Sequence, residues 1–479
     1  MSAHDFFVLS PLLILSGSSV LIMLLIAIKL SHRIIQLSSL VLFSAAFISL
    51  FYTADLLPYQ IAPLLHFDGF STFVMGLIIF SGLIVNILSY IYFDEKEESP
   101  KEYYVLLFLC TLGSCVLAIS NHFISLFLGL EILTVGLYAL IAYLRGRNNS
   151  IEAGVKYLIL AAFSSAFLLF GMALIYLETG SMGFVEIGRK LRELQAIEPV
   201  FITGLGMMLV GVGFKLAIVP FHMWTADIYQ GAPAPVTAFI ATASKGGMFA
   251  ALFRFFTAID GFELPEIMTI ITTIAIASMI IGNLLALRQN NVKRILAYSS
   301  IAHFGYLFVA FIPGSGLSLQ AISFYLMAYF ITTLTSFGIV TILSVTDHDA
   351  EDLGRYKALF WQHPILACIF TAALLSLAGI PLTAGFIGKF YVLAAGLQGG
   401  FWLIAIVLVI SSVIGLYYYL RIITMMFSKE DVVEVPEAKA HPGFFIASSA
   451  ALSLITLYII WLGIYPSGMM DFISIILKR

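Results

Sequence analysis

Apolar runs of roughly 20 residues recur along the chain, from residues 11–30 near its start to residues 443–465 near its end. A helix needs about 20 mostly apolar residues to cross the hydrocarbon core of a membrane. Hydrophobic residues make up 61% of the 479 residues and charged residues only 11%, whereas soluble domains have about 25% charged residues. The chain is therefore predicted to be an all-α, polytopic membrane protein, which excludes a large soluble domain.

We predict about fourteen transmembrane helices. Their ranges are 11–30, 34–54, 70–93, 103–119, 121–143, 155–177, 200–229, 233–258, 266–286, 292–312, 318–345, 364–397, 401–427 and 443–465. The first run lacks a preceding basic segment and a following small-residue cleavage site, so we expect a retained span rather than a signal peptide. Residues 184–197 have apolar side chains at helical spacing, which predicts a short helix in the membrane interface.

The basic residues of the loops indicate an orientation. If the N-terminus lies outside, fourteen Lys and Arg residues fall in cytoplasmic loops and six on the outer side. Because loops rich in Lys and Arg stay in the cytoplasm, both termini are predicted to lie outside. The chain also lacks a Ser- and Arg-rich transit segment. We therefore expect the chain to lie in the inner (plasma) membrane of a bacterium, with both termini on the periplasmic side. An organellar inner membrane is the weaker alternative.

One span combines a helix break with buried charge. In residues 200–229, Lys215 precedes Pro220, and the next span contains a second lysine, Lys245. A helix broken at membrane depth is tolerated only where protein or a wet cavity covers the freed backbone groups. Ionisable residues within spans are costly and usually functional. These features predict an ion pathway near the break.

A second span repeats the pattern. Residues 364–397 contain Pro381 and then Lys389, five spans after the first break. Two broken helices at matching positions of two halves indicate a transporter built from repeats, and an odd offset puts the repeats in opposite orientations. We expect four parts: an N-terminal unit at 1–102, a first five-helix repeat at 103–258, an inverted repeat at 266–427, and a C-terminal helix within 428–479.

Glu131 is the single charge within its span. A desolvated carboxylate is stabilised by a neighbouring cation, so we expect Glu131 to act with Lys215 in proton translocation, and Lys245 and Lys389 to carry the proton further. A structural role for these residues, in which lysines bind carbonyls at the breaks, remains the alternative.

Four further residues are candidates for a relay. His222 and His303 carry imidazoles near membrane depth, and His titrates closest to neutral pH. Lys293 begins a span and could guard an entrance. Lys156 lies one turn inside its span and could also extend to the headgroups.

No cofactor motif is recognisable. Cys110, Cys115 and Cys368 are scattered through apolar runs. Their spacing matches neither a disulfide framework nor a metal site. The chain has no glycine-rich nucleotide loop and no cysteine cluster for iron–sulfur centres. We expect no cofactor, no metal and no nucleic-acid partner, and an ion-moving role in the lipid bilayer.

The segment PFHMWTADIYQGAPAPVTAFIATASK, which starts at Pro220, resembles the signature of the antiporter-like membrane subunits of proton-pumping NADH:quinone oxidoreductase, respiratory complex I. It is most similar to the N type, the counterpart of subunit 2. The L and M types and the large sodium/proton antiporter subunits read more like PxHxWLPDAHxxAP, with histidine in place of Tyr229. Many relatives also have proline in place of Ala226. The GIPLTAGFIGKFY motif around Lys389 also suits the N type.

This resemblance implies fourteen helices with two inverted five-helix repeats. It implies Glu131 as the fifth-helix glutamate, and Lys156, Lys215, Lys245 and Lys389 as the lysines of the sixth, seventh, eighth and twelfth helices. It also implies partners: L- and M-type subunits and small membrane subunits of complex I. NADH, FMN, iron–sulfur clusters and quinone are expected in other subunits, so this chain would be the non-redox, translocating part of the enzyme.

Three alternatives remain open. The chain could belong to a multisubunit cation/proton antiporter, although the segment DIYQGAP favours the N type. It could be a homologous subunit of a hydrogenase- or ferredoxin-linked complex. It could also be a structural subunit whose lysines move nothing.

Overall fold

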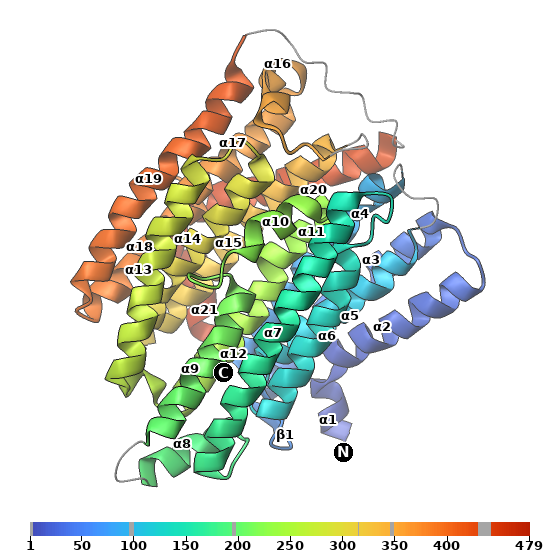
Figure 1. Ribbon diagram of the computed structural model, residues 1–479. Helices are drawn as coiled ribbons and strands as arrows, with labels where there is room; N and C mark the ends of the chain where they lie inside the picture. Colours follow the sequence, from blue (N-terminus) through green and yellow to red (C-terminus); the bar gives the residue numbers. More distant parts are fainter. Residues whose placement is uncertain (1–2, 95–99, 194–197, 315, 345–348, 430–441) are drawn as a thin grey trace.

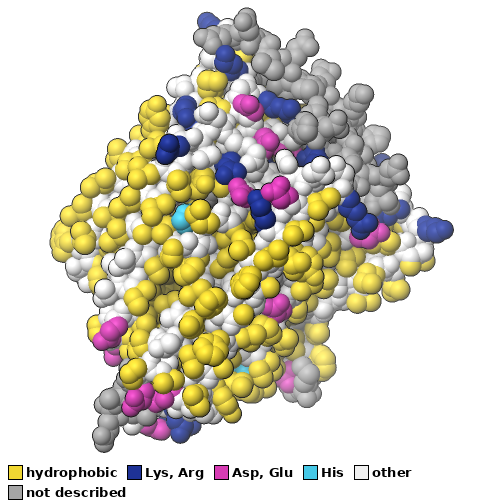
Figure 2. Space-filling model, in the orientation of Figure 1, with side chains coloured by type: hydrophobic (Ala, Val, Ile, Leu, Met, Phe, Trp, Pro, Cys, Tyr) yellow, Lys and Arg dark blue, Asp and Glu magenta, His cyan; other side chains and the backbone are white. Residues whose placement is uncertain are grey.

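The chain forms a bundle of long helices that run roughly side by side (Figure 1). The computed structural model describes residues 3–94, 100–193, 198–314, 316–344, 349–429 and 442–479. Within these residues, twelve helices are long and apolar enough to cross a membrane. Hydrophobic side chains cover most of the middle of the visible face, while charged side chains gather mainly toward its two ends (Figure 2). The prediction of an all-α polytopic membrane protein is confirmed.

The N-terminal unit contains three long helices and a small hairpin. Its elements are α1 (Ala3–Val8), α2 (Ser10–Ala27), α3 (His32–Thr53), the short η1 (Ala54–Leu56), β1 (Tyr59–Ile61), β2 (Leu65–Phe67) and α4 (Gly69–Asp94). Strands β1 and β2 pair antiparallel, with Gln60 opposite His66. The hairpin was not expected, because its strands are only three residues long and read as a loop.

The next section contains the first interrupted helix. Its elements are α5 (Glu102–Ala118), α6 (Phe123–Ile141), α7 (Asn148–Thr179), α8 (Phe184–Glu193), α9 (Pro199–Leu216), α10 (Trp224–Gly231), α11 (Ala234–Phe239), the π-helix η2 (Ile240–Ser244), α12 (Lys245–Ala258) and η3 (Gly261–Glu263). The predicted interface helix is α8, whose apolar side is buried. The last part of that prediction, residues 194–197, lies outside the described residues.

The remaining section contains the second interrupted helix. Its elements are α13 (Pro265–Leu287), α14 (Val292–Phe311), α15 (Gly316–Leu343), η4 (Leu353–Tyr356), α16 (Leu359–Gln362), α17 (Pro364–Ala378), α18 (Ala384–Gln398), α19 (Trp402–Phe427), α20 (Pro442–Ile464) and α21 (Ser467–Ile476). The predicted range 200–229 corresponds to α9 with α10, and the range 364–397 to α17 with α18. The expectation of about fourteen spans is therefore confirmed as an approximate number.

Two ends of the bundle can be distinguished by their contacts. Tyr59 of β1 donates a hydrogen bond to Asp5 over 2.6 Å, and Arg479 contacts Asp55 over 2.9 Å. Both chain termini therefore lie beside the connection between α3 and α4. We call this end, which carries α1, the β1–β2 hairpin and α21, the terminal face. The other end, which carries the starts of α7 and α14, is the opposite face.

Glycines let α7 and α9 approach closely. A Cβ atom on Gly171 would lie 2.5 Å from the carbonyl oxygen of Gly204, and one on Gly211 would lie 2.7 Å from Leu168. Small residues permit such backbone contact between membrane helices. Gly206 lies away from this contact, because a Cβ there would meet nothing within 4 Å. The close contact therefore rests on glycines spaced along one side of α9.

The centre of the bundle is formed by the least exposed helices. In the most apolar 18-residue stretches of Ala234–Ala258 and Gly316–Leu343, 100% of the residues are buried. In that of Val292–Phe311, 89% are buried. By contrast, only 33% of the residues are buried in the corresponding stretches of α2 and α7. The central helices nevertheless contain Lys245 and His303. The surrounding helices thus hold both side chains away from lipid, since Lys245 is 0% and His303 is 5% exposed.

Candidate site: a buried row of lysines between two interrupted helices

The first interruption lies between α9 and α10. Helix α9 ends at Leu216, where Ala217 adopts a left-handed conformation with φ of 59°. Residues 217–223, which include Pro220 and His222, are not helical, and α10 begins at Trp224. The indole nitrogen of Trp224 donates to the carbonyl of Phe214 over 3.0 Å. This bond satisfies one of the carbonyls that the helix end leaves free.

Lys215 lies in the last turn of α9 and is 3% exposed. Its Nζ donates to the hydroxyl of Thr134 over 3.1 Å and to that of Tyr157 over 2.7 Å. Glu131 is not its hydrogen-bonding partner in the described structure, since the carboxylate instead accepts a 2.7 Å bond from Ser165. Thr134 follows Glu131 by three residues on α6, so both side chains lie on one side of that helix. Glu131 and Lys215 are thus neighbours held apart by separate hydroxyls.

Lys245 directly follows a π-helical stretch, Ile240–Ser244. Its side chain is 0% exposed, and its Nζ donates to Ser300 of α14 over 2.5 Å. The nitrogen also lies 5.0 Å from the centre of the Phe304 ring and 5.8 Å from that of Tyr229. Short π-helical segments often occur at functional sites. Here the segment precedes the lysine at the centre of the bundle.

His303 lies on α14, between Lys245 and Lys389. Its Nδ1 is 2.7 Å from the Tyr325 hydroxyl, and its Nε2 is 3.3 Å from that of Tyr419. The ring is also in edge contact with Tyr306, with 5.4 Å between ring centres. A buried imidazole with a hydroxyl at each nitrogen can accept a proton on one side and release one on the other.

The second interruption lies between α17 and α18. Helix α17 ends at Ala378, and Gly379 follows with φ of 84°. Pro381 lies in the non-helical interval, and α18 begins at Ala384. Lys389 points back to this break: its Nζ donates to the carbonyls of Leu377 and Ala378, each over 2.9 Å. Ser412 of α19 accepts a third bond over 2.8 Å.

Aromatic rings and hydroxyls connect these groups into one row. Tyr157, bonded to Lys215, contacts Trp224, and Trp224 contacts Tyr229, with ring centres 5.5 and 6.4 Å apart. Tyr229 faces Lys245, as described above. At the other end Tyr306 contacts His303, and Nζ of Lys389 lies 4.9 Å from the Tyr306 ring centre. Between the two halves, the Phe304 ring beside Lys245 contacts Tyr329, and Tyr329 contacts His303, with ring centres 5.6 and 5.4 Å apart. The row therefore runs from Lys215 through Lys245 and His303 to Lys389.

Lys293 is placed differently from the other candidates. Its Nζ donates to the carbonyls of Gln230 over 2.9 Å and Ala232 over 2.6 Å, at the end of α10. It also forms an ion pair of 2.8 Å with Asp349. The same carboxylate accepts bonds from Arg147 over 2.9 Å and from Tyr92 over 2.6 Å. Lys293 thus fixes the end of the interrupted helix at the opposite face.

Sequence reasoning missed Asp349. It lies in the acidic stretch DHDAED, which reads as a solvated loop, yet its side chain is only 6% exposed. Its partner Lys293 precedes it by 56 residues, and Arg147 by 202 residues. Sequence spacing therefore carried no signal, and only the packing of α7, α14 and the segment after α15 brings these charges together.

Lys156 and His222 lie near the row but outside it. Lys156 is 45% exposed and pairs with Glu152 over 2.6 Å and with Asp227 over 3.4 Å. Asp227 also pairs with Arg294 over 2.8 Å. His222 is 7% exposed, and its Nδ1 is buried without a hydrogen-bond partner. The three cysteines are free, and the described residues contain no group of three or more His, Cys, Asp or Glu side chains placed to hold a metal ion.

An all-α bundle with two interrupted helices and a buried row of lysines defines an antiporter-like membrane subunit. Residues 120–415 match the family model described as the transmembrane part of NADH:quinone oxidoreductase and the Mrp antiporter. The chain belongs to this family.

Individual relatives resemble the chain over nearly its whole length. The NADH-quinone oxidoreductase subunit N of Ectopseudomonas mendocina (strain ymp) is 42% identical, covering 98% of this chain and 96% of the relative. A chain of respiratory complex I from Thermus thermophilus, solved with bound aureothin, is 32% identical with a TM-score of 0.83, covering 96% of this chain and 98% of that one.

A chain of the Mrp complex from Dietzia sp. DQ12-45-1b shares the fold at 20% identity. Its TM-score is 0.85, and the match covers 99% of this chain and 96% of that one. At this identity the likeness concerns the fold alone.

Proposed function

We propose that this chain is the N-type subunit of a proton-pumping NADH:quinone oxidoreductase and moves protons without carrying out redox chemistry itself. The observation that carries the proposal is the connected row of Lys215, Lys245, His303 and Lys389 inside a family of ion-translocating complexes. NADH oxidation and quinone reduction take place in other subunits. The chain assembles with L- and M-type and small membrane subunits in a bacterial inner membrane, with both termini in the periplasm.

Glu131 controls the charge on Lys215 in this mechanism. When the carboxylate approaches to about 4 Å, the attraction is ~4 kcal/mol at an effective dielectric constant of about 20. That energy favours the protonated lysine roughly a thousandfold. In the arrangement described above, Ser165 holds Glu131, and Thr134 and Tyr157 hold Lys215. In the proposed cycle this arrangement corresponds to the separated state, from which Lys215 would release its proton toward Lys245.

The proposal is tested at the centre of the row with Lys245→Ala in the purified complex, reconstituted in liposomes. We expect proton uptake per NADH to fall and turnover to drop by about tenfold, which corresponds to ~1.4 kcal/mol. Lys190→Ala is the control, because Lys190 is 49% exposed on α8, where it pairs with the neighbouring Glu193. Unchanged proton uptake and turnover in Lys245→Ala would exclude a role for the row.

The contacts of Lys389 favour a second role for that residue. A lysine that binds two free carbonyls at a helix break also stabilises the break. The structural alternative is thus supported at this position and can be separated experimentally, as described in the Discussion. A cation/proton antiporter subunit is distinguished by a different result: its complex would purify without hydrophilic iron–sulfur subunits.

A further inference from the structure

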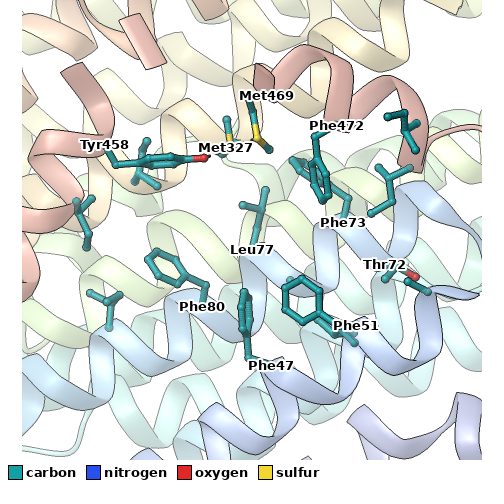
Figure 3. Close-up of a pocket in the computed structure, with 18 of the residues that line it drawn as sticks. Phe47, Phe51, Thr72, Phe73, Leu77, Phe80, Met327, Tyr458, Met469 and Phe472 are labelled. Carbon is teal, nitrogen blue, oxygen red and sulfur yellow. Dashed lines mark hydrogen bonds between the residues drawn. The ribbon is translucent and has the colours of Figure 1, made fainter. Parts of the chain in front are cut away.

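A groove near the terminal face is separate from the lysine row. It has a volume of about 730 Å³ and lies between α3, α4, α15, α20 and α21. Figure 3 shows Phe47, Phe73, Phe80 and Met327 on its wall. Apart from Asp55, Thr72, Tyr458 and Arg479, every lining residue is apolar. Pockets of roughly 300–1,000 Å³ suit small organic ligands.

The groove extends from the perimeter of the bundle to its central helix. At its mouth, Phe51 is 62% exposed and Leu454 is 68% exposed. At its base, Met327 and Ile331 of α15 are 3% and 2% exposed. An apolar space of this kind offers water few hydrogen-bonding partners, and leaving it empty would forfeit dispersion contacts along its whole wall. Its natural occupant is therefore a hydrocarbon chain.

Helix α21 covers one side of the groove. Met469, Phe472 and Ile475 recur at helical spacing and line the groove. The helix is held at both ends. The Tyr458 hydroxyl on α20 is 3.7 Å from the Met469 sulfur, and a Cβ on Gly69 of α4 would collide with the carbonyl of Ile476. An apolar stripe on a short helix at the end of the bundle is typical of a helix in the membrane interface.

Positive charge lies where this helix ends. Arg479 lines the groove, is 43% exposed and donates through Nη1 to the carbonyl of Ala54 and to Asp55. A guanidinium has five N–H donors, so donors remain for a second acceptor. Lys478 beside it is exposed. The remaining N–H donors of the Arg479 guanidinium suit a phosphate, which guanidinium groups bind well.

We propose that the groove binds one phospholipid from the leaflet at the terminal face. Its phosphate contacts Arg479, and one acyl chain follows the apolar wall between α3, α4 and α21 toward Met327. The lipid would lie between α3 and α4 on one side and α20 and α21 on the other. The proposal does not depend on which ion the lysine row moves.

The test uses phosphatidylglycerol with a photoactivatable diazirine on one acyl chain, added to the purified complex and followed by peptide mapping. We expect cross-links to the peptides that contain Met327 or Met469. Gly76→Leu places a side chain in the groove, because a Cβ at Gly76 fits at 3.7 Å from Leu50. Labelling of these peptides should fall at least fivefold. Gly17→Leu is the matched control on α2, where a Cβ would meet nothing within 4 Å.

The headgroup contact is tested separately. Arg479→Gln should reduce labelling by phosphatidylglycerol to the level given by a diacylglycerol with the same photoactivatable chain, and Lys478→Gln should reduce it less. If Gly76→Leu prevents assembly, Ala451→Leu fills the groove from α20 instead. Equal labelling in wild type, Gly76→Leu and Ala451→Leu would overturn the proposal. So would cross-links from groove residues to a helix of a partner subunit in place of lipid.

Discussion

At the residue scale, the buried lysines were visible in the sequence and their partners were not. Lys215, Lys245 and Lys389 stand out because charge within an apolar run is costly. Thr134, Tyr157, Ser300 and Ser412, which bind them, are small or aromatic residues that occur throughout membrane helices. Hydroxyls gain a role only from the packing that brings them to a cation, so periodicity and spacing could not predict them.

The Asp68–Arg254 pair gives a prediction about pH. Arg254 of α12 is 8% exposed and contacts both carboxylate oxygens of Asp68, each over 2.9 Å. Burial alone would raise the pKa of Asp68, but the guanidinium outweighs it and holds this pKa below its ordinary value. Asp68→Asn leaves a buried charge unpaired, which costs 3–5 kcal/mol in a fully buried pair. Since Asp68 is 29% exposed, we expect Asp68→Asn to lower the free energy of unfolding by about 2 kcal/mol.

This loss should depend on pH in a defined direction. A carboxyl whose pKa is lower in the folded state stabilises the fold above its unfolded pKa of about 4, and this contribution disappears as the pH falls through the folded-state value. Thermal unfolding in detergent should therefore show a lower Tm for Asp68→Asn at pH 7, and a smaller difference below about pH 4. Asp260→Asn, in an exposed pair with Arg192, should change Tm little. Equal effects of the two substitutions would contradict this account.

At the element scale, Pro and Gly marked both interrupted helices, and the structure places non-helical intervals at 217–223 and 379–383. Short elements escaped prediction. The hairpin strands have three residues each, which is too few for a periodic signal, and the ten-residue helix α21 was also not predicted. The π-helix before Lys245 is also invisible in the sequence, because it differs from an α-helix only in its hydrogen-bond register.

The two interruptions should respond differently to removal of their lysines. Lys389→Met leaves two buried carbonyls without a donor, at about 1–3 kcal/mol each. Lys215→Met removes the donor to two hydroxyls, and a hydroxyl can both donate and accept and can rotate to another partner. We expect Lys389→Met to lower the Tm of the complex clearly, and Lys215→Met to lower turnover with little change in Tm. Identical Tm values for the two variants would refute a structural role of Lys389.

The end of α10 provides a second test at this scale. Asp349 holds Lys293 and Arg147 at the opposite face, and Asp349→Ala leaves Lys293, which is 0% exposed, without its anion. Breaking such a buried pair costs about 3–5 kcal/mol. We expect poor assembly of Asp349→Ala in a pull-down of the complex. Asp352→Ala, a change at an exposed carboxylate that caps η4, should assemble normally.

At the scale of the whole molecule, the all-α class and the approximate number of spans follow from hydropathy, because a bilayer allows few other backbone arrangements. The division into inverted repeats rests on the sequence pattern and stays a prediction. What hydropathy could not provide is the packing that buries α12 and α15 fully and α14 almost fully. That packing aligns residues from distant parts of the chain into one row and removes them from lipid.

The central claim is that this row moves protons under the control of Glu131. The most direct measurement is the number of protons pumped per electron by the assembled complex in liposomes, for wild type, Glu131→Ala and Lys215→Ala. The account predicts a lower ratio in both variants and an unchanged ratio in the control Glu178→Ala, since Glu178 lies in the last turn of α7, away from the row. Wild-type ratios in both Glu131→Ala and Lys215→Ala would contradict the account.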